Sequence, residues 1–111
     1  MTDVVEITPS EFAKRWPDIT ERADVVLLDV REPVELELAA IPFAAHIPMG
    51  QIPARLHELD KESTIVVMCH GGVRSLQVAT FLSTQGFPSV INLAGGIDAW
   101  SREIDDSIPR Y

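Results

Sequence analysis

Residues 64–75 read TIVVMCHGGVRS, an apolar run that breaks at a cysteine into a glycine-rich segment. The run is short, rich in β-branched residues and apolar throughout, which is typical of a strand buried on both faces of a parallel sheet. The residues after it keep a helical apolar face, which Gly86 and Pro88 end. We therefore predict a strand, a tight loop and a helix in succession, with Cys69 at the junction of strand and loop.

Cys69 is the only cysteine of the chain, and its context favours a reactive thiolate. A thiol between a buried strand and a helix start faces backbone N–H groups and the positive end of the helix dipole, which both stabilise its charged form. Gly71 and Gly72 allow the chain to curl so that successive amides converge on one point. Arg74 adds a fixed positive charge with forked donors that suit an oxyanion. The alternative is an inert buried thiol, which would need neither the glycine pair nor the arginine.

The spacing within the loop separates two anion-binding chemistries. Four residues lie between Cys69 and Arg74, whereas loops of the tyrosine-phosphatase type place one residue more between cysteine and arginine. Ser75 occupies the position of the phosphatase arginine, so we predict that the loop is too short for a phosphoryl group. His70 either tunes the thiolate, contacts a substrate or is simply solvated, and these alternatives stay open.

Three ordered motifs resemble those of the rhodanese-like (thiosulfate sulfurtransferase) superfamily. The segment CHGGVR at residues 69–74 is similar to its six-residue loop, which suits a sulfane sulfur. The segment LLDVRE at residues 27–32 resembles the family's strand and Asp-x-Arg-Glu signature, and NLAGGIDAW at residues 92–100 resembles its Gly-Gly-x-x-x-Trp motif. The resemblance implies an α/β, three-layer fold with a parallel sheet and helices on both faces.

One segment departs from the family pattern. The family usually carries Gly-His-Ile-Pro-Gly-Ala ahead of its central strand, and this chain has AAIPFA at residues 39–44. Ala40 replaces the usual polar residue and Phe43 the usual glycine. We therefore expect a more apolar and narrower wall of the site, with an effect on the choice of substrate.

The resemblance implies a sulfurtransferase that carries a persulfide on Cys69. The thiolate would attack the sulfane sulfur of thiosulfate or a related small anionic donor, and a small-molecule or protein thiol would accept that sulfur. Two alternatives stay open: a non-catalytic rhodanese-like binding module, and a phosphatase or arsenate reductase, which the short loop and the single cysteine oppose. Besides the catalytic Cys69, the predicted site consists of the substrate-binding residues His70, Gly71, Gly72, Val73, Arg74 and Ser75.

Composition is consistent with one small cytoplasmic domain spanning residues 1–111. Residues 1–6 hold no basic region or long apolar stretch, and no apolar run approaches membrane-spanning length. Nine Lys and Arg against seventeen Asp and Glu give a net charge of −8, which disfavours nucleic acid and anionic membranes as partners. A free cysteine that reacts as a thiolate is consistent with a reducing compartment, where thiols are not oxidised to disulfides. His46 and His57 have no partner at metal-ligand spacing, so we expect no metal and no cofactor.

Strands that alternate with helical segments predict a parallel sheet with helices on both faces. We expect Asp29 and Arg31 to form a structural ion pair rather than to act in catalysis. Trp100 should face the core with Ile97 and Ile104 on one side of a helix. A capping box at residues 8–11 predicts the first helix; the remaining predicted elements are strands at 25–29, 45–47, 64–69 and 89–93, and helices at 33–39 and 52–59.

Overall fold

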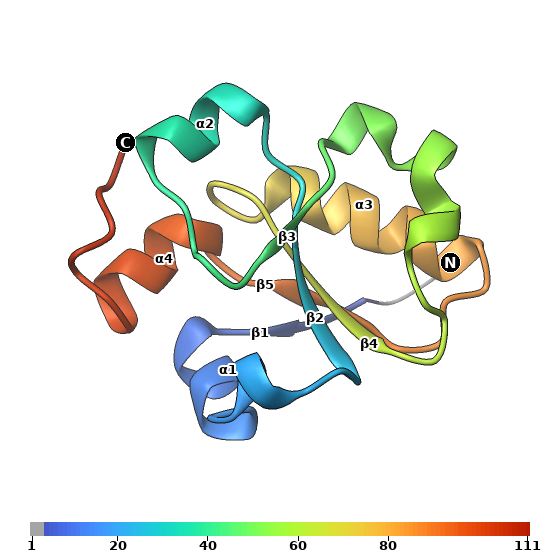
Figure 1. Ribbon diagram of the computed structural model, residues 1–111, viewed down its shortest axis with the longest axis horizontal. Coiled ribbons are helices and arrows are strands. Elements are labelled where there is room, and N and C mark those ends of the chain that lie inside the picture. Colours follow the sequence, from blue (N-terminus) through green and yellow to red (C-terminus); the bar gives the residue numbers. More distant parts are fainter. Residues whose placement is uncertain (1–3) are drawn as a thin grey trace.

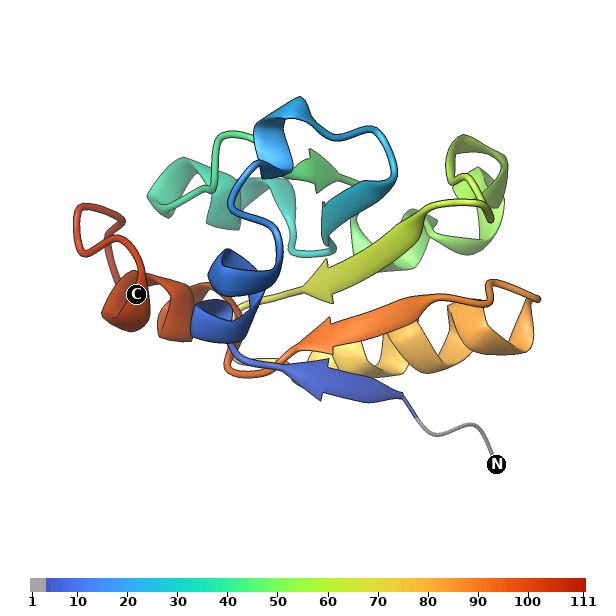
Figure 2. The same cartoon turned by 90° about the horizontal axis from the view of Figure 1, so that it is seen from below.

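The computed structural model describes residues 4–111, which form a five-stranded sheet flanked by helices (Figure 1). Residues 1–3, part of the N-terminal stretch whose sequence holds no basic region or long apolar run, lie outside the described residues. The strand order is β1-β5-β4-β2-β3 and every pairing is parallel. Figure 2 shows the arrows of β1, β4 and β5 running in the same direction. The strands are β1 (Val5–Ile7), β2 (Val25–Asp29), β3 (Ala45–His46), β4 (Thr64–Met68) and β5 (Val90–Leu93).

The helices follow the local signals in the sequence. Thr8 caps the first one: its hydroxyl accepts from the Glu11 amide at 3.1 Å, and the Glu11 carboxylate accepts from the Thr8 amide at 3.0 Å, as the capping box predicts. Within residues 4–111, no helix is apolar over enough of its length to cross a membrane. The α-helices are α1 (Pro9–Arg15), α2 (Pro33–Leu38), α3 (Val73–Thr84) and α4 (Gly96–Glu103), and the 3-10 helices are η1 (Ile19–Glu21), η2 (Met49–Gln51) and η3 (Pro53–Glu58).

Alternate residues of the central strand supply two separate cores. Val66 and Met68 pack on the face covered by α1 and α4, whereas Ile65, Val67 and Cys69 pack on the face covered by α3. All five are buried, as the period-two geometry of a strand between two helical layers requires. The predicted three-layer α/β fold is therefore confirmed, and the sulfur of Cys69 lies on the α3 side of the sheet.

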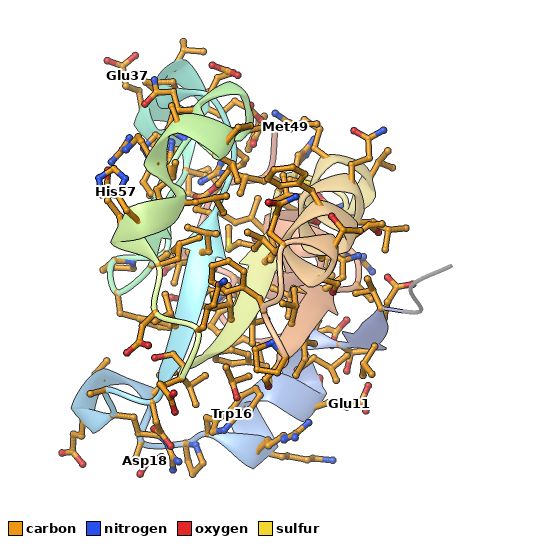
Figure 3. The ribbon with its side chains drawn as sticks, turned by 90° about the vertical axis from the view of Figure 1, so that its right-hand side faces the viewer. Glu11, Trp16, Asp18, Glu37, Met49 and His57 are labelled. Atoms are coloured by element: carbon orange, nitrogen blue, oxygen red, sulfur yellow. The ribbon has the colours of Figure 1, made fainter. Side chains whose placement is uncertain are left out.

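The aromatic cluster on the other face holds α1 against α4. The Phe12 ring meets Trp16 and Trp100 edge to face, with centroids 5.1 and 5.4 Å apart. Figure 3 shows Trp16 at the end of α1. The prediction that Trp100 and Ile97 lie in the core is confirmed, but Ile104 is 39% exposed. The helix ends at Glu103, so Ile104 no longer follows the helical face that buries Ile97 and Trp100.

Two other elements differ from the sequence prediction. Residues 52–59, which we predict as a helix, contain a 3-10 segment that is interrupted at Arg55, where φ is −115° and ψ is 18°. The edge strand β1 was not predicted. It is three residues long and Val5 is 58% exposed, so its strand character comes from pairing with the distant β5 rather than from an apolar pattern.

Candidate active site

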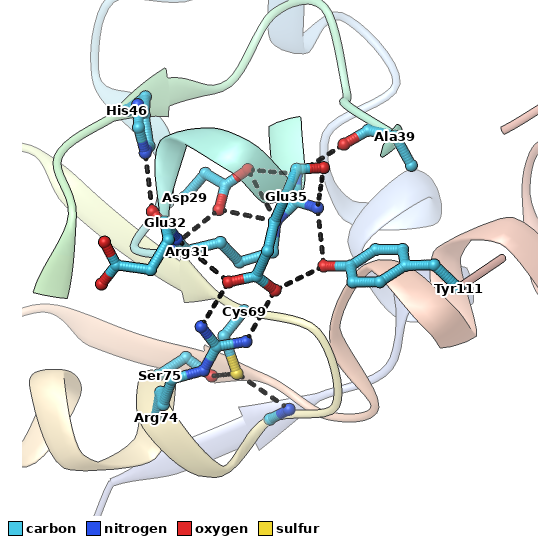
Figure 4. Close-up of polar contacts among 11 residues, drawn as sticks. Asp29, Arg31, Glu32, Glu35, Ala39, His46, Cys69, Arg74, Ser75 and Tyr111 are labelled. Atoms are coloured by element: carbon cyan, nitrogen blue, oxygen red, sulfur yellow. Dashed lines mark hydrogen bonds and ion pairs between the residues drawn. The ribbon is translucent and has the colours of Figure 1, made fainter. Parts of the chain in front are cut away.

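Cys69 lies immediately after β4, at the carboxyl edge of the sheet, and begins the Cys69 loop (residues 69–75), whose last three residues form the first turn of α3. Its sulfur accepts hydrogen bonds from the Gly72 amide at 3.1 Å and from the Ser75 hydroxyl at 3.4 Å (Figure 4). The residue is only 1% exposed. The loop therefore curls around the sulfur in the way that the glycine pair and the helix start predict.

The surroundings of Cys69 stabilise its thiolate. Burial raises the pKa of the Cys69 thiol, but the Ser75 hydroxyl and the amides of Ser75, Gly72 and Gly71 outweigh it. The net pKa of this thiol lies below its ordinary value. Hydrogen bonds to the charged form have this effect because they are lost on protonation. The thiolate is therefore held mainly by donors of its own loop.

The two loop glycines have different roles. Gly72 has a φ of 107°, and a Cβ there would lie 3.3 Å from the Gly95 nitrogen. Glycine is thus required at position 72 by conformation and by close packing. A Cβ at Gly71 would meet nothing within 4 Å, and its φ is not positive. The expectation that both glycines are needed for the curl holds for Gly72 alone.

The start of α4 holds the loop from the other side. The Ile97 amide donates to the Cys69 carbonyl at 2.9 Å, and the Asp98 amide donates to the His70 carbonyl at 3.1 Å. A Cβ on Gly96 would lie within 2.6 Å of both of these carbonyl oxygens. The Gly-Gly-x-x-x-Trp motif thus places backbone donors of α4 directly against the chain at Cys69 and His70.

Asn92 supports the same loop from β5. Its side-chain nitrogen donates to the Gly72 carbonyl at 3.2 Å and to the Glu6 carboxylate at 2.9 Å. The residue is fully buried. This role of Asn92 was not predicted from the sequence. The signal that could have indicated it is a polar side chain inside an otherwise apolar predicted strand, because buried polar groups occur where they have hydrogen-bond partners.

Arg74 is engaged with Glu35 of α2. Its two terminal nitrogens donate to the two Glu35 carboxylate oxygens at 2.6 and 2.9 Å, so the pair is bidentate. The Arg74 side chain is 34% exposed and that of Glu35 16%. Arg74 therefore also ties α3 to α2, which its place at a helix start did not predict. Within residues 4–111, Glu35 is the acidic partner of Arg74, and sequence reasoning missed it because the two lie 39 positions apart.

The pair predicts a pH-dependent stability. The bond from Arg74 lowers the pKa of Glu35 to about 2, although burial opposes the shift. A carboxyl whose folded pKa lies below its ordinary value of 4.5 stabilises the fold above that pH and loses this contribution as the pH falls toward 2. We expect Glu35→Gln to lower the free energy of unfolding by about 1 kcal/mol at neutral pH, because solvent screens this partly exposed pair.

Urea denaturation of the wild type and Glu35→Gln, at neutral pH and at about pH 3, tests this expectation. The difference should shrink at the lower pH. Glu58→Gln is the matched control, because Glu58 also pairs with an arginine, Arg55, at 2.7 Å but on an exposed surface, where ion pairs contribute little. Equal losses in the two variants, or a Glu35 effect that does not depend on pH, would contradict the expectation.

Tyr111 lies beside the Cys69 loop. Its ring stacks on that of His70, with centroids 4.2 Å apart and planes 15° from parallel. Its hydroxyl donates to Glu35 at 2.7 Å and accepts from Arg31 at 2.8 Å. Figure 4 shows Arg74 and Tyr111 reaching Glu35 from two directions above Cys69. The structure thus packs the His70 ring against Tyr111.

Asp29 and Arg31 form the predicted structural pair. The Arg31 guanidinium donates to the Asp29 carboxylate at 2.7 Å, with both side chains buried, and also to the Ala39 carbonyl at 2.9 Å. His46 contacts the Arg31 carbonyl at 2.7 Å. The pair fixes the loop between β2 and α2, so it carries Glu35 to its place opposite Arg74.

The predicted narrowing of the site by Phe43 is wrong. The Phe43 ring packs on Trp100, with centroids 5.9 Å apart, and belongs to the core on the α1 and α4 face. Cys69 belongs to the core on the opposite face. Ala40 is exposed. Phe43 lines a hollow together with Val25 and Leu27 of β2, so it lies back along β2 and away from the carboxyl edge where Cys69 lies.

No group of three or more His, Cys, Asp or Glu side chains that could hold a metal ion occurs in the part of the chain that the structure describes. The site consists instead of one buried sulfur with backbone and hydroxyl donors, beside a guanidinium. Such an arrangement can hold a nucleophilic thiolate and an anion that approaches it.

Comparison with known proteins agrees with this geometry. The rhodanese-like domain family matches residues 12–103. A sulfurtransferase of Allochromatium vinosum is 42% identical over 89% of this chain and 90% of its own. The thiosulfate sulfurtransferase GlpE of Coxiella burnetii is 34% identical over 75% of this chain and 78% of its own. The crystal structure of a rhodanese-like domain protein from Staphylococcus aureus superposes with a TM-score of 0.79 at 32% identity, covering 97% of this chain and 99% of that one. The fold, the three motifs and these relatives together show that the chain belongs to the rhodanese-like family.

Proposed function

We propose that this protein is a thiosulfate sulfurtransferase-type enzyme that carries a sulfane sulfur as a persulfide on Cys69. The observation that supports it most is the sulfur itself, whose pKa is lowered by hydrogen bonds from the Ser75 hydroxyl and the Gly72 amide. A buried structural thiol has no need of such donors. The relatives named sulfurtransferases support the same conclusion.

The first half-reaction transfers sulfur to the enzyme. The Cys69 thiolate attacks the outer sulfur of thiosulfate, the Sγ–S bond forms, and the S–S bond of the donor breaks. Sulfite leaves with the electron pair, so the step needs no proton donor. The amides of Gly71, Gly72 and Ser75 then stabilise the persulfide anion. Arg74 holds the charged end of the donor, because Glu35 uses one N–H of each terminal nitrogen and a guanidinium has five.

In the second half-reaction a thiol or a protein thiol takes up the sulfur and restores the thiolate. His70, in the Cys69 loop, and Val73, at the start of α3, complete the proposed substrate-binding residues. We place this cycle in a single domain, residues 1–111, in a reducing compartment such as the cytoplasm. Loading with thiosulfate, followed by intact mass, tests the proposal directly.

A phosphatase is the alternative that loop length discriminates. The loop from Cys69 to Arg74 holds only four intervening residues, which is too tight for a tetrahedral phosphoryl group. We expect negligible hydrolysis of an aryl phosphate by the wild type. Insertion of one glycine between Val73 and Arg74 should weaken sulfur transfer and improve phosphate binding, which inhibition by inorganic phosphate measures.

An insertion of one glycine after Thr84, at the far end of α3, is the matched control, and it should leave phosphate binding unchanged. Robust aryl phosphate hydrolysis by the wild type that disappears in Cys69→Ser would overturn the proposal in favour of a phosphatase. Failure of the wild type to take up sulfur at all would favour a non-catalytic binding module.

A further inference from the structure

Tyr111 is bound by side chains from three separate segments. The ring stacks on His70 of the Cys69 loop. The hydroxyl lies between Glu35 on α2 and Arg31 on the loop before it, at 2.7 and 2.8 Å. Burial raises the pKa of Tyr111, so the hydroxyl stays protonated and can donate to Glu35. Figure 1 shows this end of the chain lying beside α2.

The partners of Tyr111 are themselves fixed. Arg31 is fully buried and paired with Asp29. The His70 carbonyl is bonded to the Asp98 amide at the start of α4, and the buried Nε2 of its ring has no hydrogen-bond partner within residues 4–111. The His70 ring is therefore positioned by its backbone and by stacking on Tyr111.

The segment that carries Tyr111 is tied to α4. The Ser101 hydroxyl donates to the Ile108 carbonyl, and Ile108 is buried. Arg110 donates to the Asp98 carboxylate at 2.8 Å. These contacts deliver the ring to one place beside the Cys69 loop. Tyr111 nevertheless keeps 38% of its surface exposed, so part of this residue is open to solvent.

The position of the two rings bears on access to the sulfur. Cys69 is 1% exposed, so a donor reaches its sulfur only past the side chains that cover it. His70 directly follows Cys69 in the loop, and the Tyr111 ring lies parallel against the face of the His70 ring. The Glu35–Arg74 pair lies beside Cys69, and the Tyr111 hydroxyl reaches the same Glu35 carboxylate (Figure 4). A donor with a bulky group behind its sulfane sulfur would meet the Tyr111 ring.

We propose that Tyr111 is a specificity-determining residue whose ring restricts Cys69 to small sulfur donors. The inference rests on the proposed sulfur transfer. In the restricted step the Cys69 thiolate takes the outer sulfur of a thiosulfonate, the donor's S–S bond breaks, and a sulfinate leaves with the electron pair. The chemistry is the same as with thiosulfate, so only the size of the leaving group differs.

The test compares thiosulfate with benzenethiosulfonate as donors for the wild type, Tyr111→Phe and Tyr111→Ala. The readout is the ratio of kcat/KM for the aryl donor to kcat/KM for thiosulfate. We expect Tyr111→Ala to raise this ratio at least about tenfold. Tyr111→Phe is the matched control, since it keeps the ring and loses both hydrogen bonds, and its ratio should stay within about twofold of the wild type.

An unchanged ratio in Tyr111→Ala would overturn the inference, and so would an equal rise in Tyr111→Phe, because the ring would then not be the determinant. The unchanged ratio counts as this refutation where kcat/KM for thiosulfate stays near its wild-type value, whereas a general loss of structure would lower both kcat/KM values together. If Tyr111→Ala does not fold, Tyr111→Leu, which is narrower than a ring, should give an intermediate rise. A wild type that accepts sulfur from neither donor would instead refute the proposed function, and the inference with it.

Discussion

Thiosulfate should add one sulfur atom to the wild-type protein, and Cys69→Ser should take up none. The reason is that Cys69 is the only thiol of the chain, and a serine hydroxyl cannot form a persulfide. Intact-protein mass spectrometry before and after incubation measures the addition. Cyanide or dithiothreitol should then remove it, because both attack the outer sulfur of a persulfide.

Ser75→Ala is the matched variant for this experiment. It removes the hydroxyl that donates to the sulfur at 3.4 Å and leaves the Gly72 amide in place. The variant should still load one sulfur, but more slowly near neutral pH, because loss of a donor raises the pKa of the Cys69 thiol. A modified mass in Cys69→Ser would place the sulfur on another group. An unmodified wild type, under conditions that load a known sulfurtransferase, would contradict the proposed activity.

Arg74→Ala should raise the KM for thiosulfate and lower kcat/KM by roughly 10- to 150-fold, which corresponds to about 1.5 to 3 kcal/mol for a charge-assisted hydrogen bond. Arg74→Lys should retain only part of the wild-type kcat/KM, because lysine keeps the charge without the forked donors. The pair with Glu35 adds a second expectation. Its loss should lower the free energy of unfolding by about 1 kcal/mol, since the partly exposed pair is screened by solvent.

The control for Arg74 is Arg55→Ala. Arg55 also forms a bidentate pair, with Glu58 at 2.7 and 2.9 Å, but it lies on η3 away from the Cys69 loop. The Arg55→Ala variant should therefore leave the kinetics with thiosulfate unchanged. Thermal midpoints and steady-state kinetics on the same samples separate the two roles of Arg74. Unchanged kinetics with a large fall in the midpoint would make Arg74 a structural residue and refute its assignment to the donor.

Local sequence predicted the parts of the site that are close together in the chain. The apolar run before Cys69, the glycine at position 72 and the start of α3 each carry a signal within a few residues, because strand burial, positive φ and helix initiation are local properties. The Asp29–Arg31 pair was likewise predictable, since the two residues are separated by one position at the end of a strand.

The missing parts depend on tertiary contacts. Glu35 meets Arg74 across 39 positions, and Tyr111 meets Glu35 across 76. An acidic residue on a short helix and a tyrosine after the last helix are ordinary surface features in isolation. The prediction for Phe43 was wrong for a related reason. Its position in the family pattern suggested the wall of the site, but the path of the chain between α2 and β3 decides which core receives its ring.

The contacts between the Cys69 loop and α4 have a consequence for biosynthesis. The amides of Ile97 and Asp98 hold the carbonyls of Cys69 and His70, and these donors leave the ribosome after the cysteine. Strand β1 must also wait, because its partner is β5. During translation the thiol therefore emerges before its surroundings exist. The backbone at Cys69 and His70 gains these two hydrogen bonds only when α4 docks, so an unfinished chain lacks this support for the Cys69 loop.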